Sequence, residues 1–339
     1  MRQCFSIGLF ALLVLSLPGC GGFRDTKPQL PGNLDTLCMP DYASGFEMYR
    51  YDSSTLLRIV NPWQGADSVS QWVFLSRDDE KPPKGFAGET IDVPVRRIVC
   101  MSSSYVAFLE ALGADSTICA ISGTGYIWSD KVRNRIAGGE IAEAGFDNSL
   151  NFEKLVALKP DVVFLYGLTG KNAVTDKLHE LGLKTVYIGD YVENNPLGRA
   201  EWITVFGEFT GRRELASTLF DSISNEYNRA KALVSGVEKR PEVMLNAPWQ
   251  DSWFVPGDRS YMVRLLEDAG GNYACRGVDS DQSRPISTET AFVAASQSDF
   301  WLSPGTATSL AELNAMNPRF GSIPPVRNGN VYNNNARTT

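Results

Sequence analysis

Histidine is almost missing from this chain, because His179 is the only one among 339 residues. Zinc and manganese sites are built from several histidine and carboxylate ligands. A Ser-His-Asp triad, or an axial histidine on heme, would depend on His179 alone. The surrounding segment TDKLHELG is typical of an exposed helix face. The sequence therefore argues against a free zinc or manganese site, a serine hydrolase and histidine-ligated heme.

The motifs of several common enzyme classes are absent as well. No GxSxG and no P-loop sequence occurs, and SGTGYIW at residues 122–128 lacks the third glycine of a dinucleotide-binding loop. Basic residues are outnumbered by acidic ones, since 32 Lys and Arg and 39 Asp and Glu give a net charge of −7. Nucleic-acid-binding domains usually carry a basic face. We therefore expect a protein that binds small partners, needs no cofactor and is not an enzyme.

Long apolar runs are also absent. Ile7–Leu15 is apolar and follows Arg2, but it is too short to span a bilayer. It leads into Leu17-Pro-Gly-Cys20, which resembles a bacterial lipobox with Pro18 as a less usual residue. We predict a signal peptide over 1–20, a lipid on Cys20 and a periplasm-facing lipoprotein on one membrane of the cell envelope. The alternative is an ordinary secretory peptide in which Cys20 is incidental.

Cysteines are few, and none forms a CxxC pair. Beyond Cys20, the chain has Cys38, Cys100, Cys119 and Cys275, with no spacing of a metal site. Cys100 and Cys119 lie in two apolar runs that we expect to be neighbouring strands. Two interpretations stay open for this pair, a disulfide of an exported protein or two buried free thiols.

The remaining sequence divides into five segments by pattern. Residues 21–40 are rich in Gly, Pro and polar side chains and predict a flexible spacer. Short strand-like runs over 41–90 predict a small N-terminal β-element. Strands and helices alternate over 91–195 and again over 237–339, and each series predicts a parallel sheet covered on both faces. Residues 196–236 between them are helical and include one unbroken helix of about 23 residues, roughly 35 Å long.

Two segments echo each other across these halves. NFEKLVALKPDVVFL and STETAFVAASQSDFWL both open a helix at a glutamate and end in an aspartate and an apolar strand. With RRIVCMSSSYVAFLEALGA, SYMVRLLEDAGGNYA and GNVY, they resemble the periplasmic binding proteins of ABC importers for vitamin B12 and ferric siderophores, over roughly 90–335. DYVENNPLGRAEWI and the N-terminal β-element are similar to the Bacteroidetes branch. The resemblance implies an α/β fold of two Rossmann-like lobes joined by a single long helix, although the second series here lacks a final helix.

The resemblance also implies a transport role and its partners. The chain would capture a ferric siderophore between its lobes and deliver it to an ABC permease and its ATPase. A corrinoid is the alternative cargo, and a non-transport envelope or sensory protein is the alternative of another class. Glu153 and Glu289, one in each lobe, match the glutamates that meet permease arginines in this family. A carboxylate in the first turn of a helix is also stabilised by the helix dipole, which is the structural alternative.

Ligands of parallel α/β sheets bind beyond the carboxyl ends of the strands, and the loops there are rich in aromatic residues. Stacking on such rings suits a bulky planar or catecholate-like guest, although each ring could instead pack under its own loop. Arg259 and Arg337 could pair with an anionic ligand, and heme held by Tyr105 or Tyr166 stays open. The predicted ligand-binding residues are Ser103, Tyr105, Tyr126, Trp128, Tyr166, Tyr191, Trp249, Trp253, Arg259 and Arg337.

Overall fold

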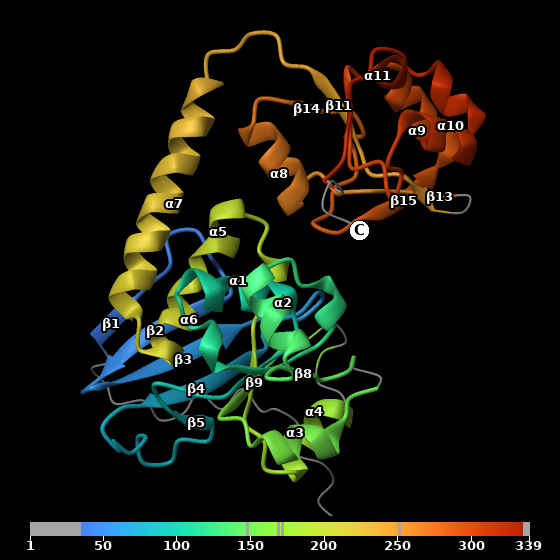
Figure 1. Ribbon diagram of the computed structural model, residues 1–339. Helices are drawn as coiled ribbons and strands as arrows, with labels where there is room; N and C mark the ends of the chain where they lie inside the picture. The colour runs from blue at the N-terminus through green and yellow to red at the C-terminus, as the bar shows by residue number, and fades with distance from the viewer. Residues whose placement is uncertain (1–34, 147–148, 168–169, 171–172, 250–251, 335–339) are drawn as a thin grey trace, which may run out of the picture.

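The computed structural model (Figure 1) describes residues 35–334 except 147–148, 168–169, 171–172 and 250–251. The predicted lipid site at Cys20 and the predicted ligand contact Arg337 lie outside these residues. Among the described helices, none combines the length and the hydropathy needed to cross a bilayer. The four described cysteines are free thiols, and Cys100 and Cys119 are both buried.

The first lobe is built on a five-stranded parallel sheet. Its strand order is β10-β9-β6-β7-β8, and the alternation along β6 shows how both faces are covered: Ile98 and Cys100 pack into one core and Val99 into another. Helices α1 and α2 contribute to the first core, α3 and α4 to the second. The elements are β6 (Ile98–Cys100), α1 (Ser103–Ala111), β7 (Ile118–Ile121), α2 (Asp130–Ala137), β8 (Ala142–Glu143), α3 (Phe152–Leu158), β9 (Val162–Leu165), α4 (Ala173–Glu180) and β10 (Thr185–Tyr187).

The N-terminal β-element is a five-stranded sheet that shares a core with the first lobe. Phe46 and Leu57 belong to the same buried cluster as Ile98 of the parallel sheet. Gln71 joins the two sheets, because its amide donates to Thr185 O at 2.8 Å and accepts from Tyr187 N at 2.9 Å on the edge strand β10. The strands run in the order β1 (Asp35–Cys38), β2 (Phe46–Tyr51), β3 (Ser54–Val60), β4 (Ser70–Ser76) and β5 (Glu89–Asp92), antiparallel except for β4 and β5.

Two buried carboxylates hold the chain that enters this sheet. Glu201 accepts the backbone N–H groups of Asp41, Tyr42 and Ala43 at 2.7–2.9 Å. Glu193 accepts those of Ser44 and Gly45 at 2.9–3.0 Å. Five consecutive backbone donors are thereby satisfied by side chains of the helical tract, which fixes the first-lobe end of this tract against the N-terminal sheet.

The helical tract ends in the long helix that the sequence predicts. It consists of α5 (Pro196–Glu201), α6 (Ile203–Thr210) and α7 (Arg213–Leu233). The apolar side chains of α7 differ in burial, since Leu215 and Ile223 are open to solvent, whereas Ala216 and Phe220 are buried. Only the first half of α7 packs on the first lobe, and the second half runs on to the other lobe (Figure 1).

The second lobe has its own core and two small sheets. A parallel sheet has the order β14-β11-β16-β17, and an antiparallel sheet that the sequence did not predict has the order β12-β13-β15. Trp253, Trp301 and Phe320 are fully or almost fully buried in the core. The elements are β11 (Glu242–Leu245), β12 (Pro248–Trp249), β13 (Ser252–Val255), α8 (Tyr261–Asp268), β14 (Asn272–Tyr273), β15 (Arg284–Ser287), α9 (Thr288–Ser296), β16 (Phe300–Leu302), α10 (Leu310–Met316), α11 (Pro324–Arg327) and β17 (Val331–Tyr332).

Helices α7 and α5 both contact helix α8 of the second lobe. Asp268 of α8 accepts a hydrogen bond from Tyr227 at 2.9 Å and forms an ion pair with Lys231 at 2.8 Å. Tyr227 and Lys231 both belong to α7. Helix α5 lies below α8 in Figure 1 and contacts it. One parallel sheet in each lobe, a core of the second lobe separate from those of the first, and one connecting helix confirm the predicted two-lobe α/β fold.

Candidate functional site

The carboxyl edge of the first parallel sheet gathers most of the predicted ligand contacts of that lobe. Across the sheet, Tyr191 follows β10, Tyr166 follows β9, Ser103 follows β6, and Tyr126 and Trp128 follow β7. The strand order reverses beside β6, where the loops after neighbouring strands diverge and open a crevice. The topology therefore puts five predicted residues along one edge, on the side where α/β sheets receive ligands.

Two predicted contacts are wrong, because their side chains are core residues. Tyr105 is fully buried, and its hydroxyl donates to Leu165 O at 3.1 Å and Ile188 O at 3.2 Å. Burial also raises the pKa of this phenol well above its usual range. Trp253 is fully buried, and its indole N–H donates to Leu245 O at 3.1 Å. Neither side chain reaches a ligand, so heme ligation by Tyr105 is excluded as well.

The loop with Tyr126 and Trp128 is exposed but firmly held. Tyr126 is 67% exposed and Trp128 is 49% exposed. Glu143 fixes the start of the loop by accepting the N–H groups of Gly123 and Thr124 at 3.0 and 2.8 Å. These two rings are therefore presented to solvent from a fixed backbone.

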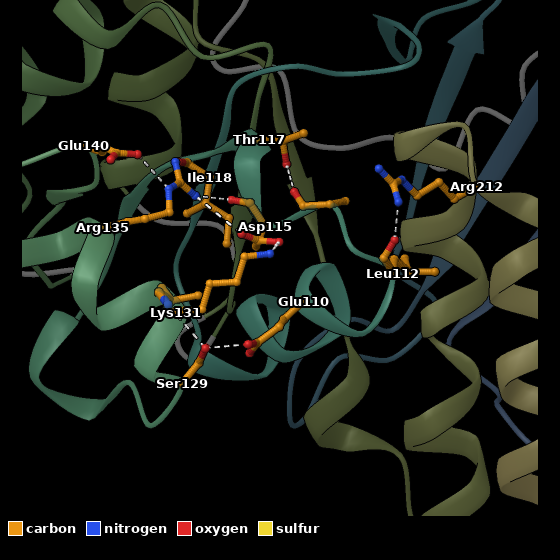
Figure 2. A network of polar contacts seen from close by, with 12 residues as sticks. Glu110, Leu112, Asp115, Thr117, Ile118, Ser129, Lys131, Arg135, Glu140 and Arg212 are labelled. Carbon is orange, nitrogen blue, oxygen red and sulfur yellow. Dashed lines mark hydrogen bonds and ion pairs between the residues drawn. The ribbon is translucent and has the colours of Figure 1, made fainter. Parts of the chain in front are cut away.

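A polar network anchors the end of this loop to the helices around it (Figure 2). Ser129, the N-cap of α2, donates to Glu110 of α1 at 2.5 Å. The buried carboxylate of Asp115 pairs with Lys131 at 2.6 Å, and Arg135 binds the backbone oxygen of Asp115 at 2.5 Å. Helix α2 is thereby fixed to α1 and to the turn that follows α1.

Tyr166 and Tyr191 form a tilted ring pair near a buried acid. Their ring centroids lie 4.2 Å apart, and burial raises the pKa of Tyr191 to about 12. Asp190 beside them is 6% exposed, and its Oδ1 has no hydrogen-bond partner among the described residues. Burial raises the pKa of Asp190 from 3.8 to about 6, although a hydrogen bond from Ser104 and the charge of Arg199 oppose the shift. This cluster joins the loops after β6, β9 and β10.

A cavity of about 480 Å³ lies between the lobes, next to this cluster. It has three walls: the N-terminal sheet contributes Asn61 and Trp63, the turn and helix after β10 contribute Tyr191 and Arg199, and the second lobe contributes Asn246 and Tyr261. Its size lies within the usual range for small-molecule sites, roughly 300–1,000 Å³. Because β10 and β11 both end at this cavity, it occupies the position that parallel sheets offer to ligands.

Of the predicted ligand-binding residues, Tyr191 lines this cavity. Trp63 was not among the predictions, and Arg199 lies in a segment that carried only a family resemblance. Neither residue carries a local signal, since their places in the cavity depend on how the β3–β4 loop packs against the turns after β9 and β10.

Of the predicted contacts in the second lobe, Arg259 does not line the cavity. Arg259 is exposed and forms an ion pair with Asp279 beside the second lobe. Trp249 lies in β12, but its side chain is outside the described part of the chain. Within the described residues, no group of three or more His, Cys, Asp and Glu side chains could hold a metal ion.

Glu153 and Glu289 have equivalent local positions in their lobes. Each is exposed in the first turn of a helix, α3 or α9, that begins immediately after a capping side chain. Asn151 caps α3 by accepting from Lys154 N at 3.0 Å, and Ser287 caps α9 by accepting from Thr290 N at 3.1 Å. Because these caps already occupy a free backbone donor of each helix, both glutamates are available to a partner.

Comparison with known proteins gives relatives over most of the chain. An uncharacterized lipoprotein of Methanocaldococcus jannaschii is 26% identical, over 98% of this chain and 87% of the relative. Among solved structures, a periplasmic heme-binding protein of Vibrio cholerae has a TM-score of 0.58 at 18% identity, with 70% of this chain and 88% of that chain covered. A periplasmic binding protein of Veillonella parvula also has a TM-score of 0.58, at 14% identity, over 80% of this chain and 88% of that one.

The sequence model of one family matches most of the chain, over residues 98–338. The match begins at β6, so it includes both parallel sheets and α7 and leaves out the N-terminal sheet. Two lobes, a connecting helix and a cavity between the lobes agree with a solute-binding family. The chain belongs to the periplasmic binding protein family.

Proposed function

We propose that this protein is the lipid-anchored substrate-binding protein of an ABC importer and captures an iron chelate such as a ferric siderophore. The observation that carries the proposal is the cavity walled by both lobes, because a guest there touches both and favours their closed arrangement. Three aromatic rings in its walls, Trp63, Tyr191 and Tyr261, suit a bulky chelate by area burial and stacking. The described residues offer no metal cluster, so iron would arrive already chelated.

A corrinoid is the second candidate cargo, and the amide side chains of the cavity favour it. Asn194, Asn246 and Gln282 line the walls and offer neutral donors and acceptors. The periphery of a corrinoid carries amides that such groups can pair with. Titration of the tryptophan fluorescence with ferric siderophores, heme and cyanocobalamin decides between the cargo classes. Saturable quenching by none of them would contradict a cargo of either kind.

Docking to the permease is assigned to Glu153 and Glu289, which are exposed at helix starts in different lobes. Exposed carboxylates that meet guanidinium groups provide orientation and salt-sensitive docking rather than large affinity. We expect Glu153→Ala with Glu289→Ala to abolish uptake in cells that carry the cognate permease and ATPase, with an unchanged Kd for the cargo. The matched control is Glu180→Ala with Glu238→Ala, which removes the same charge from two other exposed positions. A higher Kd for the cargo in the first double variant would place the glutamates in the pocket and contradict the docking role.

A further inference from the structure

Among the described residues that line the interlobe cavity, Arg199 is the one with a cationic side chain. Its Nε donates to Glu193 O at 3.1 Å and its Nη2 to Tyr191 O at 2.6 Å. The guanidinium carbon lies 3.9 Å from the ring centroid of Tyr261, which belongs to the other lobe. Two hydrogen bonds and one ring therefore fix the plane of the guanidinium at the point where the lobes meet.

The charge of Arg199 is left without a direct counter-charge. A guanidinium has five N–H donors, and the described contacts use two of them on neutral carbonyl oxygens. Among the described residues, none of its hydrogen-bond partners is a carboxylate. Asp190 acts on it at longer range, and Asp281, the single acid among the described lining residues, is exposed on the second-lobe side. An oriented, partly buried cation with free donors is a receptor for an anion.

The β3–β4 loop supplies the wall beside Arg199, and it packs closely on the first lobe. A Cβ added to Gly189 would lie 3.2 Å from Pro62 Cα, and one added to Gly170 would lie 3.1 Å from the ring of Trp63. Trp63 also packs edge to face on Tyr187 at 5.1 Å. The ring of Trp63 is thereby held in the cavity wall by contacts that do not need a ligand. The family match starts only at residue 98, so this wall is an addition to the two lobes.

Resting on the proposed function, we infer that Arg199 recognises an anionic group of the cargo and that the 61–66 loop forms a third wall of the same site. The cargo is then a negatively charged chelate, with carboxylate, catecholate or similar oxygens directed at the three free donors of Arg199. A neutral corrinoid or a cationic chelate gains nothing from this charge and has to desolvate it. Arg199 thus selects among the cargo classes that the cavity can hold.

The test is a charge series of chelates measured against four proteins. The probes are ferric enterobactin and ferric citrate, which are anionic, cyanocobalamin, which is neutral, and ferrioxamine B, which is cationic. The proteins are the wild type, Arg199→Gln, Arg199→Lys and the control Arg212→Gln, whose arginine also donates to a backbone carbonyl, Leu112 O at 2.6 Å, but lies outside the cavity. Tryptophan fluorescence gives Kd, and circular dichroism checks the fold.

We expect at least one anionic chelate to bind the wild type most tightly, with Kd raised at least tenfold in Arg199→Gln, less in Arg199→Lys and not in Arg212→Gln. The wild-type affinity for that chelate should fall, and its Kd rise, with added NaCl. This second readout holds even if Arg199→Gln does not fold. An unchanged Kd in a folded Arg199→Gln, or a salt-independent Kd, overturns the inference. Tightest binding of cyanocobalamin or ferrioxamine B overturns it while a transport role survives, and binding of no probe overturns both.

Discussion

The two lobes belong to one fold type but are stabilised in different ways. The first lobe shares its core with an added five-stranded sheet, and buried carboxylates of the helical tract satisfy the backbone of residues 41–45. The second lobe relies on a compact aromatic core around Trp253, Trp301 and Phe320. The added sheet thus makes the first lobe the larger unit and gives it an extra cavity wall, so the cavity depends unequally on the two sides.

The strongest test of the difference between the lobes is the substitution of Glu193, which is 2% exposed. Glu193→Ala leaves the N–H groups of Ser44, Gly45 and Trp202 without their acceptor. At about 1–3 kcal/mol for each buried donor, we expect the first unit to lose about 5 kcal/mol of its free energy of unfolding. Because the cores are separate, the second lobe should unfold at its usual urea concentration. Denaturation followed by near-UV circular dichroism measures both transitions.

The control for this prediction is Glu238→Ala, an exposed position between α7 and β11. It should leave both transitions unchanged, since it removes a solvated charge. Parallel losses in both lobes after Glu193→Ala would show that the chain unfolds as one unit. That result would contradict the separate cores on which the comparison rests.

The next largest effect is expected from Trp253→Ala in the second lobe. Trp253 contacts the rings of Trp301 at 5.4 Å and Phe320 at 6.0 Å, and its truncation should cost about 3–5 kcal/mol. Phe254→Ala is the matched control, because Phe254 is the neighbouring ring on the exposed face of β13, and its loss should cost below about 1 kcal/mol. Urea unfolding should show the loss in the second transition only. Equal losses in the two variants would contradict the core position of Trp253.

The architecture was more accessible from the sequence than the site. The alternation of strands and helices predicted both lobes, and the predicted unbroken helix of about 23 residues corresponds to the 21 residues of α7. Local pattern could also have corrected two site residues. Tyr105 precedes Leu109 by four positions, so it lies on the apolar face of α1, and Trp253 and Val255 alternate with the exposed Phe254 along β13. We assigned both rings to the ligand site because they lie close to the end of a strand. The spacing of the apolar residues along α1 and β13 is the stronger signal, and it places both rings in the core.

The cavity itself could not be predicted, for a different reason. Trp63 and Arg199 are far apart in the sequence and meet only because Glu193 and Gln71 dock the N-terminal sheet on the first lobe. Such docking depends on single buried hydrogen bonds between segments more than 100 residues apart, and periodicity carries no information about them. The short β12-β13-β15 sheet was missed because strands of two to four residues leave almost no repeat to detect.

The smallest and most specific effect concerns Asp190, at the ligand edge of the first lobe. Its pKa is raised by burial from 3.8 to about 6, so the folded state holds the proton more tightly than the unfolded chain. The contribution of this group to stability is therefore full below pH 4 and is lost as the pH rises through 6. Asparagine does not ionise, so Asp190→Asn should match the wild type near pH 4 and exceed its free energy of unfolding by about 3 kcal/mol at pH 7. Urea denaturation across this range measures the difference, with Asp221→Asn on the exposed side of α7 as the control. A difference between the wild type and Asp190→Asn that stays constant with pH would mean that the carboxyl is solvated, and the ligand edge of the first lobe would then be open to water even without cargo.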